Sequence, residues 1–157
     1  MLDLDSIDQH ILAELALQGR LSNHELSERV GLSPTPCARR VKRLEQEGLI
    51  RGYHADINPK ARGMTICVMI SVRLAKHKPD GHSAFRETIG KSQEVVECFM
   101  VTGNADYILK AWFPDIDALR HFITTTVQNL PEVAETSTML VVDTIVSGAR
   151  QQAFSTP

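Results

Sequence analysis

The segment 21–47, LSNHELSERVGLSPTPCARRVKRLEQE, decides the fold of the N-terminal part of the chain. Ser22 or Asn23 can cap a first short helix, because a side-chain oxygen there accepts an otherwise unpaired backbone N–H. Gly31 is typical of the left-handed residue that ends such a helix, and Ser33 is typical of the cap that begins the next one. The segment therefore predicts two helices joined by a tight turn.

The second of these helices carries most of the basic charge of the segment. Cys37, Val41 and Leu44 recur at helical spacing and predict a buried stripe. The polar side chains of the remaining surface are Thr35, Arg39, Arg40, Lys42 and Arg43. A short helix, a glycine turn and a basic second helix are typical of the helix-turn-helix, whose second helix lies in the major groove of double-stranded DNA.

The polar residues of the second helix suit different parts of a duplex. Ser33 and Thr35, at the start of the helix, suit phosphate contacts through hydroxyl and backbone N–H groups. Arginine side chains offer planar donors for guanine edges or phosphates, and the pattern leaves open which arginine contacts which. An ion pair with Glu47 is the alternative for Arg43, and a solvated charged face is the alternative for the whole surface.

The composition is that of a globular protein of one or two domains. The chain has 157 residues, of which 43% are apolar and 23% are charged, and its net charge is −2. No apolar run reaches the length of about 20 residues that a membrane span needs, and the acidic N-terminus argues against export. We read Cys37, Cys67 and Cys98 as reduced thiols and expect a cytoplasmic protein without a membrane partner.

The basic residues are concentrated in one place. Residues 39–51 contain five Lys and Arg against two Glu, on a chain that is otherwise slightly acidic. A basic helix on a near-neutral protein favours a site-specific DNA-binding protein over one that coats nucleic acid generally.

A helix starting at Asp5 or Ser6 precedes this motif, with Ile7, Ile11, Leu12 and Leu15 on its apolar face. After the motif, Leu49, Ile50, Tyr53 and Ala55 indicate a small β element. Three helices and a β wing form a winged helix-turn-helix domain over residues 1–60. The polar, turn-rich segment 58–63 marks its end.

The remaining residues predict a second domain over 64–150, in which the apolar residues follow a different pattern. Continuous or alternating apolar stretches predict strands at 64–75, 95–101, 107–113 and 133–145. Helical spacing and caps predict a helix after Asp80 and another after Asp115 or Asp117. The order βαββαβ is the ferredoxin-like split unit of the α+β class. Its open sheet face carries apolar residues, which favours pairing with a second subunit.

With these elements placed, the chain resembles the leucine-responsive regulatory protein/AsnC family of transcription regulators nearly end to end. The resemblance is carried by LDxxDxxIL at the start, by SPTPCxRRVxRLE followed by GxIxGY, and by EVVECFMVTGNADYILK. It implies a winged helix-turn-helix, a βαββαβ effector domain, dimers through that domain and higher oligomers such as octamers. It also implies a small-molecule effector, an amino acid or a related metabolite.

The TGNADY turn matches the effector turn of this family. Gly103 lets backbone N–H groups approach a ligand carboxylate, and Asp106 offers a charge for a ligand amine. An ordinary hairpin turn is the alternative. Asn104 and Ala105 replace the acidic and larger residues that are frequent there, so a less negative, roomier pocket is expected. The candidate effector residues are Gly103, Asn104, Ala105, Asp106, Tyr107 and, on the last strand, Thr136 and Thr138.

The sequence also bears on two other function classes. An architectural DNA-binding protein of the same fold, without effector response, is the alternative to a ligand-responsive regulator. An enzyme is disfavoured, because no nucleophile–base pair, phosphate loop or paired carboxylates stand out. We expect no metal and no cofactor: His77 and His82 flank a loop but lack further ligands.

Overall fold

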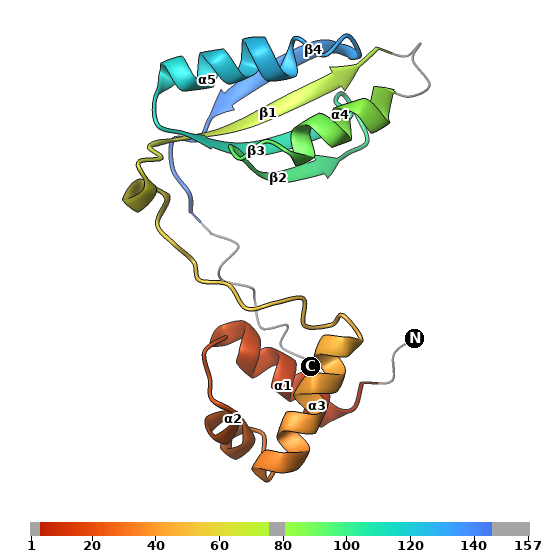
Figure 1. Ribbon diagram of the computed structural model, residues 1–157, viewed down its shortest axis with the longest axis vertical. Helices are drawn as coiled ribbons and strands as arrows, with labels where there is room; N and C mark the ends of the chain where they lie inside the picture. The colour runs from red at the N-terminus through yellow and green to blue at the C-terminus, as the bar shows by residue number, and fades with distance from the viewer. Residues whose placement is uncertain (1–3, 76–80, 146–157) are drawn as a thin grey trace. The chain divides into compact units, whose positions relative to one another are not determined.

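The computed structural model describes residues 4–75 and 81–145. Contacts divide the chain into two compact units, the first containing the residues up to Asp56 and the second spanning Ile57–Thr144 (Figure 1). Each unit has its own buried apolar cluster.

The N-terminal unit is built from three helices with well-defined starts, α1 (Ser6–Leu17), α2 (Asn23–Arg29) and α3 (Pro34–Gln46). Asp5 caps α1 by accepting the Asp8 N–H at 2.8 Å. Ser22 caps α2 in a reciprocal capping box with Glu25. Ser22 is one of the two predicted caps of α2, and α1 begins at Ser6, one of its two predicted starts. The buried hydrophobic side chains of this unit are Ile11, Leu26, Val30, Cys37 and Leu44.

The predicted β element at 49–55 is not formed. Residues 49 and 50 form a bend, residues 51–58 have no regular secondary structure, and no strand of the described residues pairs with them. A β ladder needs a partner strand to receive its backbone hydrogen bonds, and Gly52 interrupts the segment with φ of 152°. Tyr53 instead donates its hydroxyl to the Glu45 carboxylate at 2.9 Å, which ties this segment to α3.

The C-terminal unit has the predicted βαββαβ order. A 3-10 turn, η1 (Pro59–Arg62), leads into β1 (Ile66–Leu74), α4 (Gly81–Gly90), β2 (Val95–Met100), β3 (Tyr107–Phe113), α5 (Ile116–Phe122), the π-helical η2 (Ile123–Val127) and β4 (Val133–Leu140). The strands form one sheet in the order β2-β3-β1-β4, and each neighbouring pair is antiparallel. The predicted cap at Asp80 lies outside the described residues.

The last strand is shorter than predicted. It ends at Leu140 rather than Ile145, because its partner β1 begins at Ile66. The final backbone bond of this pair runs from Val141 N to Cys67 O at 2.9 Å. Beyond it the apolar residues no longer face a neighbouring strand.

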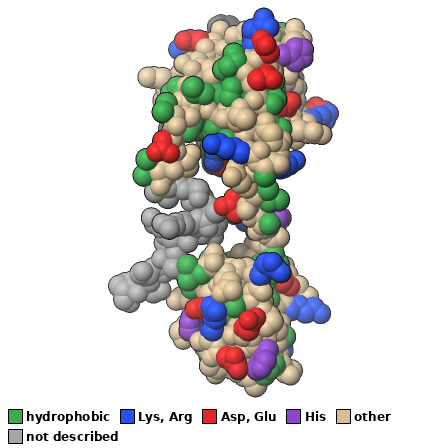
Figure 2. Space-filling view, turned by 90° about the vertical axis from the view of Figure 1, so that its left-hand side faces the viewer, with side chains coloured by type: hydrophobic (Ala, Val, Ile, Leu, Met, Phe, Trp, Pro, Cys, Tyr) green, Lys and Arg blue, Asp and Glu red, His purple; other side chains and the backbone are tan. Residues whose placement is uncertain are grey.

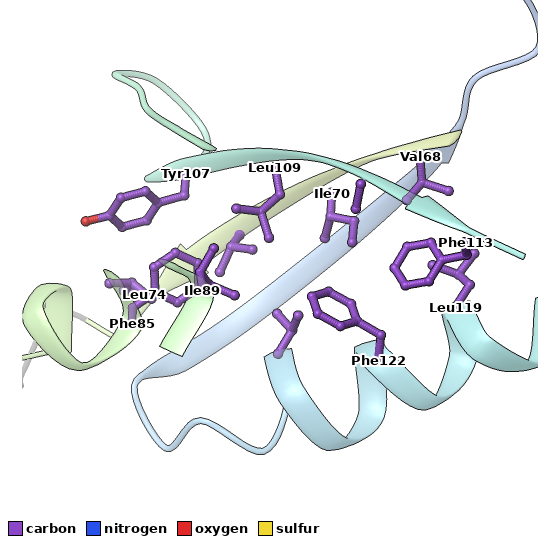
Figure 3. Packing of buried hydrophobic residues seen from close by; sticks show 13 residues of the cluster. Val68, Ile70, Leu74, Phe85, Ile89, Tyr107, Leu109, Phe113, Leu119 and Phe122 are labelled. Atoms are coloured by element: carbon purple, nitrogen blue, oxygen red, sulfur yellow. The ribbon is translucent and has the colours of Figure 1, made fainter. Parts of the chain in front are cut away.

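One sheet face is covered by both helices, and the other is open. Val68, Ile70 and Val72 of β1 are fully buried beneath Phe85 and the other helix residues of the cluster. Figure 3 shows Phe85, Ile89, Leu119 and Phe122 directed toward the sheet.

The opposite face is the open sheet face, defined by Met69, Phe99, Ile108, Trp112 and Met139. Cross-strand pairing places these residues together, since Phe99 opposes Ile108 and Met69 opposes Met139. Phe99 and Met139 are each about half exposed, and hydrophobic side chains are visible on the surface of this unit (Figure 2).

Candidate nucleic-acid interface and effector site

Helix α3 is held by its apolar side. Cys37 and Leu44 are fully buried against residues of α1 and α2. Asn23 at the start of α2 donates its side-chain amide to the Pro34 carbonyl at 2.9 Å. Between the two helices, Gly31 adopts φ of 69°, a conformation that side chains with a Cβ rarely adopt. The turn and the buried stripe therefore fix which side of α3 faces outward.

The outward side of α3 carries four of the six predicted DNA-binding residues, and a fifth, Arg43, is also exposed but forms an ion pair. Ser33, Thr35, Arg39 and Lys42 are all exposed. Ser33 occupies the N-cap position, but its side chain makes no capping hydrogen bond. Within the described ranges, Arg39 and Lys42 take part in no side-chain hydrogen bond or ion pair. These two cationic side chains are available to contact phosphates or base edges of DNA.

Arg40 and Arg43 are used differently, because both pair with acidic residues of α1. Arg40 Nη1 donates to Asp5 Oδ2 at 2.7 Å and to Asp8 Oδ1 at 2.9 Å. Arg43 Nη2 donates to Asp8 Oδ2, so the ion pair of Arg43 is with Asp8 rather than with Glu47. The structure thus divides the predicted arginines into a free one and two anchored ones.

Hydrogen bonds in this cluster shift the pKa of Asp5 and that of Arg40. The pKa of Asp5 is lowered, first by the hydrogen bond from the Asp8 backbone N–H and then by the Arg40 guanidinium. The pKa of Arg40 is raised by its hydrogen bonds to Asp5 and Asp8. Both shifts favour the charged forms, so the ion pair between Asp5 and Arg40 is maintained at neutral pH.

Sequence reasoning missed Asp5 and Asp8 as partners of the arginines. The available signal was the spacing of Asp8 from Ile11, Leu12 and Leu15, which puts a carboxylate on the apolar face of α1. A buried acidic residue requires a cationic partner, but the sequence does not show which of the basic residues, more than 30 positions away, supplies it.

The predicted effector turn has an exposed tip and an anchored base. Thr102, Gly103 and Asn104 are exposed, and Gly103 has φ of 117°. Asp106 accepts the Leu74 N–H with its carboxylate Oδ2 at 2.7 Å. Its backbone N–H donates to Val72 O at 2.9 Å. One carboxylate oxygen of Asp106 is therefore committed to connecting the hairpin with β1.

Tyr107 faces the helix side of the sheet. It is buried, with its hydroxyl 2.9 Å from His82 Nδ1 and accepting from Arg86 Nε at 3.1 Å. Together with Arg86, Cys98 and Met100 it lines a surface groove of about 370 Å³ between α4 and β2. Gly103, Asn104 and Ala105 are not among the lining residues, so the predicted effector residues are divided between two surfaces.

Thr136 and Thr138 lie on β4, opposite Val72 and Ile70 of β1. They therefore share the helix-covered side of the sheet with those residues. Thr136 accepts a hydrogen bond from Gln128 Nε2 at 3.0 Å. Val72 pairs with Thr136 on one side and with Tyr107 on the other, so Tyr107 and Thr136 lie in one row across the sheet.

The comparisons with known proteins agree with this arrangement in both units. Residues 4–51 match the winged helix-turn-helix DNA-binding family, and residues 67–151 match the Lrp/AsnC ligand binding domain. The chain is 43% identical over 148 residues to the leucine-responsive regulatory protein of Escherichia coli strain K12, covering 94% of this chain and 90% of the relative. In the described residues, no helix is long and apolar enough to span a membrane.

Solved structures show the same fold. A transcriptional regulator of Neisseria meningitidis in complex with L-Met has a TM-score of 0.88 and 39% identity, covering 92% of this chain and 94% of that one. An AsnC family transcriptional regulator from Agrobacterium tumefaciens has a TM-score of 0.85 and 31% identity, with the same coverage. This chain therefore belongs to the Lrp/AsnC family of DNA-binding transcription regulators, whose members combine a winged helix-turn-helix with an amino-acid ligand-binding domain.

Proposed function

We propose that this chain recognises double-stranded DNA in the cytoplasm mainly through the outward side of α3, with its DNA-binding domain in residues 1–60 and its effector domain in 64–150. The observation that carries the proposal is the exposure of Ser33, Thr35, Arg39 and Lys42 on the second helix of the turn motif. The two hydroxyls at the helix start suit phosphates, and Arg39 suits a guanine edge or a phosphate.

The test begins with selection of binding sites from a random-sequence duplex library by the full-length protein. Gel-shift titrations at fixed salt then compare the selected duplex with a shuffled duplex of equal composition. We expect the selected duplex to bind at least about a thousandfold more tightly, as site-specific proteins do. Failure to enrich any sequence would contradict site-specific recognition.

We also propose that an amino acid or a close relative binds beside the hairpin of β2 and β3 and shifts assembly or DNA affinity. Support comes from the family's ligand-binding domain and from the L-Met complex of the Neisseria relative. The exposed Gly103 can bring backbone N–H groups to a carboxylate, while the second carboxylate oxygen of Asp106 is the candidate for an amine. A thermal-shift panel of amino acids tests this, because a ligand that binds the folded state raises its melting temperature.

The groove between α4 and β2 is a second candidate for the effector. Arg86 supplies a cation for a carboxylate, and Ile89, Val95 and Met100 supply an apolar wall. Replacing Arg86 with Gln distinguishes the two locations: it would weaken a ligand of the groove and leave a ligand of the hairpin almost unaffected.

For the oligomer, we propose a homodimer through the open sheet face, assembled further into an octamer or similar complex. Leaving Phe99, Ile108 and Met139 in water would be unfavourable. Light scattering on the full chain tests the assembly. An architectural DNA-binding protein without effector response remains the alternative, and it would be favoured by DNA affinity that stays the same across the amino-acid panel.

A further inference from the structure

Asp8 of α1 is a buried carboxylate between two arginines of α3. Its side chain is 1% exposed. Oδ1 accepts from Arg40 Nη1 at 2.9 Å, and Oδ2 accepts from Arg43 Nη2. A carboxylate removed from water needs charged partners, and loss of one partner is strongly unfavourable. Neither arginine can therefore break its ion pair with Asp8 and bind a DNA phosphate elsewhere without a large cost in free energy.

The two arginines differ in exposure and in the number of N–H donors that remain available to a partner outside the protein. Arg40 is 26% exposed and has a second carboxylate on the same helix, Asp5. Arg43 is 43% exposed, and Asp8 is its ion-pair partner within the part of the chain that the structure describes. A guanidinium has five N–H donors in a rigid fork. Most donors of Arg43 are thus available, but their direction is set by the bond to Asp8.

We propose that Asp8 is a positioning residue for DNA recognition, which holds Arg43 in one orientation on the flank of α3. This inference rests on the proposed role of α3 in DNA binding. Phosphates line every duplex, so a freely rotating arginine adds affinity for any sequence. An arginine held by a buried carboxylate contacts an acceptor only where the correct sequence presents it, and therefore adds discrimination.

A purely structural role for Asp8 would be to hold α1 against α3. Such a role affects the stability of the domain, but it does not alter how a folded protein distinguishes one duplex from another. The ratio of affinities for selected and shuffled duplexes separates the two roles. The salt dependence of binding is a second such measure, because it counts the phosphates that are contacted.

The experiment replaces Asp8 with Asn in the full-length protein, which preserves the shape of the side chain and removes its charge. We expect the variant to bind the selected duplex less tightly and the shuffled duplex more tightly, lowering the ratio about tenfold, the value of one weak bidentate contact. On the shuffled duplex, the released Arg43 should steepen the log–log salt slope by about 0.9.

The matched control is Asp5→Asn, which removes a charge facing Arg40 alone. Asn is as good an N-cap as Asp, so α1 keeps its start, and the ratio should stay within about twofold, as for an exposed ion pair. A folded Asp8→Asn protein with the wild-type ratio would overturn the proposal. An equal drop in both variants would also overturn it, because the effect would then be one of general charge.

If circular dichroism shows that Asp8→Asn does not fold, Arg43→Gln decides the matter. This variant keeps the Asp8–Arg40 pair, and the proposal requires a lower ratio without a steeper salt slope. An unchanged ratio would overturn it. Loss of the proposed function itself is distinguishable, because the wild-type protein would then enrich no duplex, whereas failure of this inference alone leaves the enrichment by wild-type protein intact.

Discussion

Helix α3 and the hairpin between β2 and β3 are both predicted binding surfaces, and they use their charged residues in opposite ways. On α3, Arg40 and Arg43 are anchored to α1, whereas Arg39 and Lys42 remain outward. In the hairpin the charged residue Asp106 is directed inward, to the backbone of β1. Helical periodicity in the sequence predicted which side of α3 is buried and which side faces outward. A turn has no period, so its composition does not distinguish a ligand contact from a structural one.

The largest expected effect is a loss of stability when a buried side chain of α3 is shortened. It tests whether DNA binding by the outward side of α3 depends on the packing of its buried side. Leu44 is fully buried, and Leu44→Ala should destabilise the N-terminal unit by about 2–5 kcal/mol, since a cavity adds to the lost burial. Affinity for the selected duplex should fall with it. Thermal and chemical denaturation measure the loss, and Leu17→Ala is the matched control, because Leu17 is 67% exposed. Equal stability of the two variants would contradict the packing described for α3.

The comparison also shows how far the sequence could predict this molecule. Apolar spacing gave the helices and strands, and the caps Ser22 and Asp115 were among the predicted ones. The missing strand at 49–55 and the shortened β4 depend on whether a partner strand is present, which local sequence does not contain. The inward roles of Asp8 and Asp106 are non-local for the same reason, as each joins elements more than 30 residues apart.

Arg39, the free arginine of α3, is expected to contribute directly to DNA affinity. Arg39→Ala should weaken binding to the selected duplex by about 1–3 kcal/mol if the side chain makes a bidentate base contact. Its melting temperature should stay close to that of wild type, because Arg39 is exposed and forms no ion pair with described residues. Gel-shift titration and a melting curve on the same sample check both parts. A stable protein with undiminished affinity would show that α3 does not dock through this side.

The hairpin is tested by two substitutions at one position. Asp106→Ala leaves the Leu74 N–H without its acceptor and should destabilise the C-terminal unit by about 1–3 kcal/mol. Asp106→Asn retains a side-chain oxygen for that N–H and should cost less. If the free carboxylate oxygen also contacts a ligand amine, Asp106→Asn should weaken that ligand in calorimetry while basal DNA binding is retained. Equal ligand affinity in Asp106→Asn and wild type would assign Asp106 to the turn alone.

The smallest expected effect is a loss of stability at low pH. It depends on two carboxylates at the helix starts of the N-terminal unit. The pKa of Asp5 lies below its ordinary value of 3.8 because of the Asp8 N–H and Arg40. The pKa of Glu25 lies below 4.5 because of its hydrogen bonds from the hydroxyl and backbone N–H of Ser22. A carboxylate whose pKa is lower when folded stabilises the protein above its unfolded pKa, and this contribution is lost as the pH falls through the folded value.

Both caps lie in the N-terminal unit, so we expect its helices to lose stability as the pH falls from about 5 to about 3. The double variant Asp5→Asn/Glu25→Gln keeps the capping geometry with groups that do not titrate, and its melting temperature should vary less over this range. Glu47→Gln is the control, since Glu47 is exposed and its side chain makes no hydrogen bond with described residues. If the double variant followed the same acid profile as Glu47→Gln, the caps would not be the source of the pH dependence, and carboxylates elsewhere, such as Glu87 with its lowered pKa beside Lys91, would have to account for it.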